Sequence, residues 1–323
     1  MLMLNQYVIR KGEWLVLDMD GIILDPAYSA PSHELAQPRA GSHPHLVRQW
    51  LLAHSFFPLK WVNRIFSVGG IKWQDDQVLL HAFPALNMSK DKLYCNALKN
   101  MDAAIPPLLY EDDYCLVINK PAGMPVHASY EGQTGMLDEA VARHMILKKD
   151  PLPVRHIHRL DDDTSGPVLY SKNDLAQLRL DEAMREKLIG RIYIAVVQGR
   201  MKRNAGTINQ PIGKDRHHSA KRRVTPHGDS AITHYEVIEQ RENLTVVRVQ
   251  LETGRTHQIR IHMSHIGHPL VGDTLYGGSS KELGHQALHG EELQFDHPLT
   301  GNRINVPAPW PTWLQKLAGI VHP

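Results

Sequence analysis

The sequence of 323 residues contains only two cysteines, Cys95 and Cys115. Two cysteines are too few for a disulfide framework, and they fit a reducing compartment. No apolar run reaches the roughly 20 residues that a membrane-spanning helix needs, and the N-terminus carries acidic residues where a signal peptide would have its apolar core. We therefore expect a cytoplasmic protein, and its length suffices for two domains and a full hydrophobic core.

The chain also has little net charge, +2 from 36 basic and 34 acidic residues. The total gives no argument for a nucleic-acid partner, so the distribution of charge has to decide. Between Gly199 and Arg223 the local balance is +7, because Asp215 is the single acid among eight basic residues: Arg200, Lys202, Arg203, Lys214, Arg216, Lys221, Arg222 and Arg223. A charged run is usually a solvated face, but one so one-sided is typical of a surface that contacts a phosphate backbone.

The stretch from His158 to Gly166 holds the residues with the clearest chemistry, His-Arg-Leu-Asp-Asp-Asp-Thr-Ser-Gly. An extended run precedes it and an apolar run, 168–170, follows, so its carboxylates should lie in a tight turn. Composition alone favours a solvated acidic turn, and Thr164 or Ser165 could simply cap a helix. A calcium loop is excluded, because the alternating oxygen ligands and the closing glutamate are missing.

The order His-Arg-Leu-Asp-x-x-Thr-Ser-Gly resembles the signature of RNA pseudouridine synthases of the RluA type. The resemblance implies that Asp161 is the catalytic carboxylate and that Arg159 helps to evict the target uridine from its helix. Where the family usually has Leu after the glycine, this chain has Pro167, which removes a backbone donor. We expect a local bend there that leaves Asp161 unaffected.

Further motifs extend the resemblance over about residues 107–315. The run Asn-Lys-Pro-Ala-Gly-Met-Pro-Val-His matches the first family motif, in which Lys120 is either a phosphate contact or a surface charge. Tyr193 lies on a predicted strand, 191–198, at the place of the family's active-site tyrosine. The run Gly-Arg-Thr-His-Gln-Ile-Arg-Ile-His, 254–262, matches the third motif, whose first Arg pairs with the catalytic Asp. That role falls on Arg255, and His257 and Gln258 become candidates for substrate binding together with Lys221, Arg222 and Arg223.

A second enzyme class has to be weighed at the N-terminus. An apolar run ends in Asp18-Met-Asp20-Gly, which looks like the nucleophile loop of haloacid-dehalogenase-type phosphatases. Such enzymes use the first Asp as nucleophile and the second as acid and base beside a magnesium ion. A Pro-, Ser- and His-rich loop, 26–45, stands where their crossover helix should begin, and too little chain remains before the signature's domain. We expect residues 15–24 to form a strand, an acidic turn and a second strand.

Hydrophobic spacing and turn residues divide the chain into three parts, 1–86, 87–104 and 105–323. The first part has helices predicted at 46–53 and 59–68 and a hairpin through Asp75 and Asp76, which resembles a small RNA-binding module named after a ribosomal protein. Its basic residues are sparse, so a packing domain without RNA contacts is the alternative. Residues 87–104 are polar and should form a linker. In the third part we expect a helix from Asn173 or Asp174 to Gly190, with Leu188 on its apolar face, and another from Arg255.

The resemblance implies an α+β fold, with a central mixed, mostly antiparallel sheet flanked by helices behind the small N-terminal α/β module. It also implies an isomerase that detaches uracil from the ribose, rotates it and rejoins it through carbon 5. Such a reaction needs a carboxylate, a cation to orient it and an aromatic residue, here Asp161, Arg255 and Tyr193, and no cofactor. No metal site is expected, because His262, His265 and His268 drift around a helix without a Cys or acid to complete a set. The expected partner is ribosomal or transfer RNA and the expected state a monomer. A catalytically inactive RNA-binding protein of the same fold is the alternative.

Overall fold

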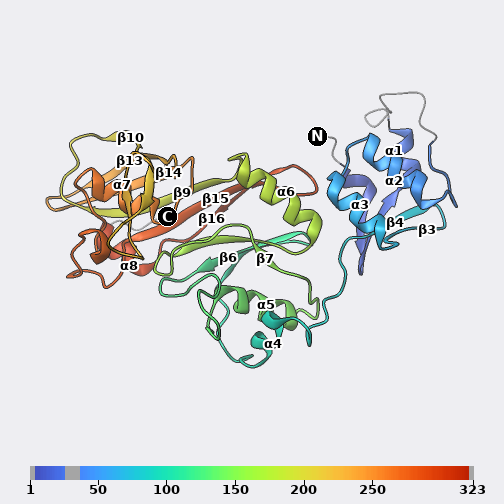
Figure 1. Cartoon of the computed structure of the whole chain (residues 1–323), viewed down its shortest axis with the longest axis horizontal. Helices are drawn as coiled ribbons and strands as arrows, with labels where there is room; N and C mark the ends of the chain where they lie inside the picture. The colour runs from blue at the N-terminus through green and yellow to red at the C-terminus, as the bar shows by residue number, and fades with distance from the viewer. Residues whose placement is uncertain (1–3, 26–36, 320–323) are drawn as a thin grey trace.

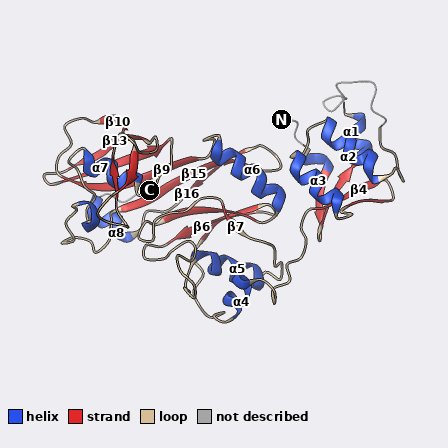
Figure 2. Ribbon diagram, in the orientation of Figure 1, coloured by secondary structure: helices blue, strands red, loops and turns tan. Residues whose placement is uncertain are grey.

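The structure is a computed structural model that describes residues 4–25 and 37–319. A small N-terminal module lies at one end of the molecule, and the larger remainder of the chain carries the long sheet (Figure 1). Helices cover both parts, and strands form the centre of each (Figure 2). Among the described residues, no helix combines the length and the apolar character that crossing a membrane requires.

The N-terminal module is a four-stranded antiparallel sheet in the order β1-β2-β4-β3 with helices packed against it. The two predicted helices and the hairpin are present, and Asp75 takes a left-handed conformation (φ +53°) in the turn. The elements are η1 (Asn5–Tyr7), β1 (Val8–Lys11), β2 (Trp14–Asp18), α1 (Met19–Leu24), α2 (Pro44–Ala53), α3 (Leu59–Ser67), β3 (Ile71–Gln74) and β4 (Gln77–His81).

The second strand expected before residue 25 is wrong, because residues 19–24 form helix α1. The side chain of Asp18 accepts a hydrogen bond from the backbone N–H of Gly21 at 3.0 Å, so Asp18 is the N-cap of this helix. The predicted loop at 26–45 lies mostly outside the described residues. Helix capping therefore accounts for Asp18 without a phosphatase active site.

The segment 87–104, expected to be a polar linker, contains helix α4 (Lys92–Leu98). Asp91 caps this helix by accepting from the N–H groups of Leu93 and Tyr94. The helix packs against α5 (Leu137–Leu147), and the fully buried Tyr94 donates from its hydroxyl to the carbonyl of Leu152 at 2.5 Å. The sequence did not predict this helix, because only two of its side chains, Tyr94 and Ala97, are fully buried and they give too short an apolar pattern.

Two antiparallel sheets form the larger part of the chain. The first has the order β5-β6-β8-β7, and the second the order β10-β13-β14-β9-β15-β16. Ser165 forms a parallel bridge with His289, so the sheets meet at the end of the His158–Gly166 turn. The first sheet is built from β5 (Leu108–Glu111), β6 (Cys115–Lys120), β7 (Arg155–His156) and β8 (Gly166–Ser171).

The six-stranded sheet carries a helix on each face. In β9 (Gly190–Gln198), Tyr193, Ala195 and Val197 belong to the core that includes Ile259 and Met263 of helix α7 (Gln258–His265), whereas Ile194 and Val196 face helix α8 (Thr312–Ala318). This alternation is the period-2 pattern of a strand that is buried on both sides. The other strands are β10 (Ala205–Asn209), β13 (Ile232–Gln240), β14 (Leu244–Leu251), β15 (Leu288–Asp296) and β16 (Arg303–Pro307).

Two smaller features differ from expectation or complete the fold. Helix α6 (Asp174–Arg185) begins after the predicted cap Asn173 but ends before Leu188, which is 55 % exposed. Lys187 breaks the helix with φ +59°. A short hairpin of β11 (Ile212–Lys214) and β12 (Arg222–Val224) holds the end of the basic stretch, and the 3-10 helix η3 (Thr274–Tyr276) follows α7.

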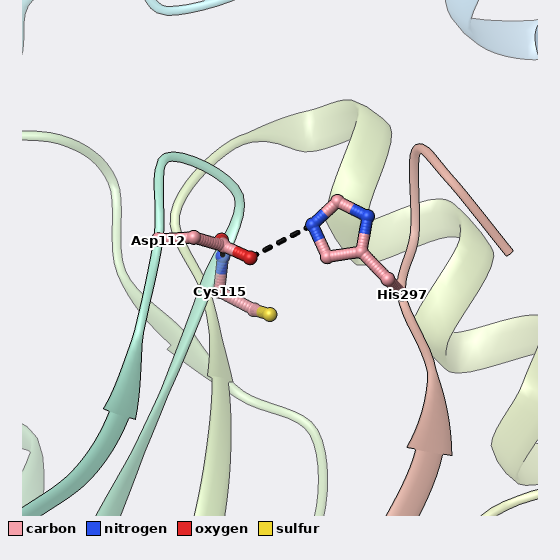
Figure 3. Close-up of side chains that lie close together, drawn as sticks. All are labelled: Asp112, Cys115 and His297. Carbon is pink, nitrogen blue, oxygen red and sulfur yellow. Dashed lines mark hydrogen bonds and ion pairs between the residues drawn. The ribbon is translucent and has the colours of Figure 1, made fainter. Parts of the chain in front are cut away.

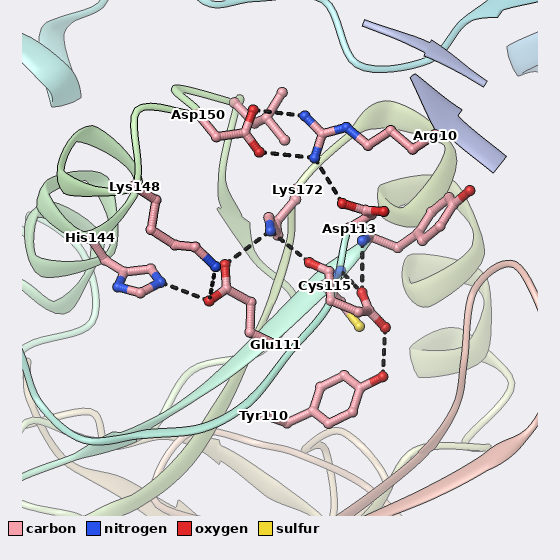
Figure 4. A network of polar contacts seen from close by, with 12 residues as sticks. Arg10, Tyr110, Glu111, Asp113, Cys115, His144, Lys148, Asp150 and Lys172 are labelled. Carbon is pink, nitrogen blue, oxygen red and sulfur yellow. Dashed lines mark hydrogen bonds and ion pairs between the residues drawn. The ribbon is translucent and has the colours of Figure 1, made fainter. Parts of the chain in front are cut away.

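Ionic contacts join the N-terminal module to the larger part (Figure 4). Arg10 of β1 donates to both carboxylate oxygens of Asp150 at 2.7 and 2.9 Å and to Asp113 at 2.9 Å. In the same view Glu111 accepts from His144, Lys148 and the buried Lys172. At a second point, Arg64 of α3 pairs with Asp174 at the start of α6 at 2.9 Å. Because the two attachments lie on different elements, they oppose rotation of the module about either one.

Candidate active site

The predicted catalytic Asp161 lies in the turn between β7 and β8. Its backbone carbonyl accepts from the N–H of Thr164 at 3.0 Å, which closes the turn, and its side chain is 21 % exposed. A cavity opens over it, lined on one side by this turn and on the other by β9 and the start of α7. Asp161 is therefore half-buried and lines a cavity that is open to a ligand.

The cation beside Asp161 is Arg260, and the predicted partner Arg255 is wrong for this pair. Nη1 of Arg260 donates to Oδ2 of Asp161 at 3.0 Å, whereas Nε of the exposed Arg255 donates to the carbonyl of Ser230 at 3.1 Å. The reason is where α7 begins. Arg255 precedes the first helical residue, Gln258, and its guanidinium is bound to Ser230, while Arg260 lies in the first turn of the helix and reaches the signature turn.

Arg260 is fixed from behind by a second carboxylate. Its Nε and Nη2 donate to the two oxygens of Asp273 at 2.7 and 2.9 Å, and Asp273 is only 1 % exposed. Burial alone would lower the pKa of the guanidinium, but the hydrogen bonds and charges of Asp273 and Asp161 raise it instead. Arg260 thus stays charged and rigid, and its Nη1 is held in place to donate to Asp161.

His257 lies beside the same carboxylate. Its Nε2 is 3.9 Å from Oδ2 of Asp161, and its Nδ1 is 2.9 Å from the hydroxyl of Tyr276. That hydroxyl accepts from the backbone N–H of Arg222 at 3.0 Å, so its own proton is free to be donated to Nδ1 of a neutral imidazole. Burial lowers the pKa of His257 against the opposing charge of Asp161. A neutral ring with its proton on Nε2, facing Asp161, fits these contacts.

Tyr193 lies in the cavity as its place on β9 predicts. It is 6 % exposed, and among the described residues its hydroxyl has no hydrogen-bond partner. Burial raises the pKa of the phenol, so the hydroxyl is protonated near neutral pH. An aromatic face with a free polar tip can contact a planar base and one of its polar atoms.

Lys120, a candidate phosphate contact, is instead fully buried. Its Nζ donates to the carbonyl oxygens of Pro121, Met124 and Asp162 at 3.0, 2.6 and 2.6 Å. Burial lowers the pKa of this ammonium to about 8. A surface role is wrong, because the side chain ties the loop of the first motif to the residue that follows Asp161.

Gln258 is also occupied inside the protein. Its Oε1 accepts from the hydroxyl of Thr253 and the N–H of Arg255, and its Nε2 donates to the carbonyl of Ile232 and the hydroxyl of Thr233. All four contacts are 2.8–3.0 Å long. Gln258 lines the cavity but already uses its polar atoms to hold the loop before α7, which departs from the predicted substrate contact.

The remaining candidates lie at the rim. Arg159 is exposed, and its Nη1 is 3.5 Å from Nε2 of His127. Arg223 is exposed and Lys221 and Arg222 are half-buried on the β11–β12 hairpin, which contacts α7. The backbone contact between Arg222 and Tyr276 places this hairpin next to His257 and therefore next to the cavity.

One group within residues 4–25 and 37–319 has three potential metal ligands close together, Asp112, Cys115 and His297 (Figure 3). The oxygens of Asp112 already accept from the hydroxyl of Tyr110 and the ring of His297, at 2.5 and 2.8 Å, as well as from two backbone N–H groups. Burial raises the pKa of the Cys115 thiol well above its usual value, so no thiolate is offered. The group does not fit a metal, and it clips the β5–β6 turn to the end of β15.

The sequence reading missed Arg260, Asp273 and Tyr276. All three stand in stretches that resemble family motifs, and the signal that could have found Arg260 is its place in the first turn of the predicted helix, three positions after His257. Asp273 and Tyr276 follow α7 in Gly-Asp-Thr-Leu-Tyr-Gly, where no local pattern reveals that the chain turns back onto the helix.

The amino-acid sequence is similar to those of known RNA pseudouridine synthases. A family profile described as RNA pseudouridylate synthase matches residues 113–265. "Uncharacterized RNA pseudouridine synthase YhcT" of Bacillus subtilis (strain 168) is 46% identical over 212 residues, which cover 65% of this chain and 70% of that protein. "Ribosomal large subunit pseudouridine synthase D" of Pseudomonas aeruginosa is 40% identical over 227 residues, which cover 65% and 71%.

Among solved structures, "Human RNA Pseudouridylate Synthase Domain Containing 1" aligns with a TM-score of 0.56 at 24% identity, over 67% of this chain and 89% of that chain. "Human RNA Pseudouridylate Synthase Domain Containing 4" gives 0.55 at 23%, over 68% and 95%. At these identities the likeness concerns the fold alone. It confirms the α+β class with mostly antiparallel sheets that the motifs implied.

Proposed function

The chain belongs to the family of RNA pseudouridylate synthases, and we propose that Asp161 is the carboxylate with which it converts uridines of ribosomal RNA to pseudouridine. The protein is an RNA pseudouridine synthase, an isomerase that acts on RNA. The observation that carries the proposed role is the hydrogen bond from Arg260 to Asp161 in the wall of a cavity that Tyr193 also lines. The matching of the chain to relatives named for the large ribosomal subunit supports ribosomal over transfer RNA.

The reaction assigns one task to each side chain. Asp161, which accepts a hydrogen bond from Arg260, acts at the ribose either as a nucleophile or as a base while the bond to nitrogen 1 breaks. The detached uracil stacks on Tyr193, turns and presents carbon 5 to the sugar. The Tyr193 hydroxyl is protonated at the start, so it can take up the proton of carbon 5 only if it passes its own proton to an acceptor such as Asp161.

The target base has to leave its stack before it reaches the cavity, at a cost of a few kcal/mol. Arg159 is exposed at the rim two residues before Asp161, and it lines the cavity. A long, planar and always charged side chain there can fill the gap that the base leaves. The basic β11–β12 hairpin then holds the RNA backbone beside the opening.

One experiment tests the proposal. Purified wild-type protein and Asp161→Asn are incubated with unmodified ribosomal and transfer RNA, and pseudouridine is mapped at nucleotide resolution. We expect new sites in ribosomal RNA with the wild type and none with Asp161→Asn, which should bind RNA within a few-fold of the wild type. Turnover by Asp161→Asn would remove Asp161 from the reaction, and sites confined to transfer RNA would overturn the ribosomal assignment.

A further inference from the structure

Four arginines line the cavity over Asp161, and three of them already have polar partners. Arg260 is shared by two carboxylates, Arg255 donates to a carbonyl, and Arg159 contacts a histidine ring. The fourth, Arg191 of β9, has no hydrogen bond or ion pair among the described residues, and its Nε is buried without a partner. A half-buried guanidinium with no acceptor is costly unless something that binds there supplies one.

The place of Arg191 relates it to the substrate. It stands two residues before Tyr193 on the same face of β9, so their Cα atoms are about 7 Å apart. Both side chains line the cavity, together with Asp161. A nucleotide whose base lies on Tyr193 can therefore reach the guanidinium with its sugar-phosphate.

Gly254, which also lines the cavity, leaves space for the side chain of Arg191. A Cβ atom added to Gly254 would lie 2.5 Å from Nη1 and 3.2 Å from Nη2 of Arg191, so the guanidinium lies against the bare backbone of Gly254. Gly254 does not have a positive φ, and its backbone therefore accepts any residue. The glycine is thus needed here for the space it leaves to Arg191.

We propose that Arg191 binds the phosphate group of the target nucleotide and so positions the uridine over Asp161. The planar fork of a guanidinium matches two oxygens of a phosphate, and this anion compensates the unpaired charge. The proposal rests on the proposed function, because it takes the cavity over Asp161 as the place where the target uridine binds.

The test measures binding in the Asp161→Asn background, where no turnover disturbs the equilibrium. Arg191→Gln should weaken binding of a stem-loop RNA substrate about 10- to 100-fold and reduce the slope of log affinity against log salt by about 0.7 to 0.9. Arg185→Gln, an exposed arginine on α6, is the matched control and should change neither. Within the described part of the chain Arg191 makes no hydrogen bond or ion pair that its loss would break, so the variant should fold.

A modified RNA identifies the acceptor. Replacing the phosphate of the target nucleotide by a neutral methylphosphonate should weaken binding to the Arg191 protein, and should add no further loss with Arg191→Gln. The same replacement three nucleotides away should weaken both proteins equally. If instead the losses from the protein change and the target methylphosphonate multiply, Arg191 contacts something other than that phosphate, and the proposal is overturned.

Gly254→Ala gives a second route to the same conclusion without touching Arg191. The added methyl group should displace the guanidinium and reproduce much of the binding loss, and it should have no further effect in combination with Arg191→Gln. Full binding by Gly254→Ala contradicts the proposal. Failure of the proposed function is separate, since it would appear as turnover by Asp161→Asn whatever the binding data show.

Discussion

Asp161 is held by one hydrogen bond, whereas the Asp273 behind it shares two with the same guanidinium. This unequal sharing anchors Arg260 to the buried carboxylate, and the half-buried Asp161 is held less tightly, which suits its proposed role at the ribose. It also gives Arg260 two roles, charge stabilisation at Asp161 and compensation of a buried charge at Asp273, which a substitution should separate.

Arg260→Lys should lower the single-turnover rate by at least 100-fold with a much smaller change in RNA affinity, because an ammonium cannot bridge both carboxylates. It should also lower the free energy of unfolding, by up to about 3–5 kcal/mol if Asp273 is left unpaired. Arg255→Lys is the matched variant and should stay within a few-fold of the wild-type rate. A larger defect in Arg255→Lys than in Arg260→Lys would restore the assignment made from the motif alone.

Arg159 should matter for extracting the base rather than for bond chemistry. Arg159→Ala should be severely impaired on a uridine held in a folded stem, and less so on a short unstructured RNA whose base is already free. Single-turnover rates on the two RNAs decide it. Equal losses would mean that Arg159 serves Asp161 directly.

The sequence motifs predicted which residues carry reactive side chains in the cavity. They could not predict which side chains are buried or which distant residues contact them. Asp161 and Tyr193 lie in the cavity, as a signature turn and a strand position indicated. Lys120 and Gln258 were read as surface contacts because a motif gives residue types and not the direction of side chains. Arg191 and Asp273 emerged only when distant parts of the chain were brought together.

At the scale of elements, the strongest alternations and the best caps were predictable. The hairpin at residues 71–81, helix α6 after Asn173 and strand β9 follow local signals. Helix α1 was mistaken for a strand, because six residues with only Met19 and Ile22 buried give no helical period to read. Helix α4 was missed because its short apolar face is completed by α5, which lies far along the chain.

The β11–β12 hairpin is the element that should carry backbone contacts. Replacing Lys221, Arg222 and Arg223 with Ala should weaken RNA binding and reduce the slope of log affinity against log salt by about 0.7–0.9 for each lost phosphate contact. The backbone bond from Arg222 to Tyr276 survives these changes, so the hairpin should stay docked. Alanine at the exposed Arg185 and Lys316 is the control. An unchanged slope in the triple variant would return the basic stretch to an ordinary solvated face.

At the scale of the whole molecule, Glu111 lies at the centre of the polar network near the junction of the two parts. Burial alone would raise the pKa of its carboxyl, but the hydrogen bonds of Lys148, His144 and Lys172 outweigh burial and lower the pKa to about 2. Because the folded value lies below the unfolded value, Glu111 adds stability above pH 4.5, and this contribution fades as the pH falls toward 2.

Glu111→Gln should therefore lower the free energy of unfolding by on the order of 1–3 kcal/mol at pH 7, and the difference from the wild type should shrink between pH 4.5 and the acid limit. Urea unfolding at several pH values measures it. Glu182→Gln, on the exposed face of α6, should show no such trend. A difference that is constant with pH would mean that the glutamine acts through packing and not through charge.

The turn that carries Asp161 is joined to the late part of the chain through backbone. Gly290 donates to the carbonyl of Ser165 at 2.7 Å, and a Cβ on Gly166 would lie 2.6 Å from the Gly290 backbone. A ribosome synthesises the turn first, then α7, then Asp273 and last of all β15. The counter-charge of Asp161 is complete once Arg260 and Asp273 have been made, but until β15 emerges Leu288 is missing from the wall of the cavity. We therefore expect a half-made chain to be inert toward RNA, and the enzyme to become active only when its own synthesis is nearly over.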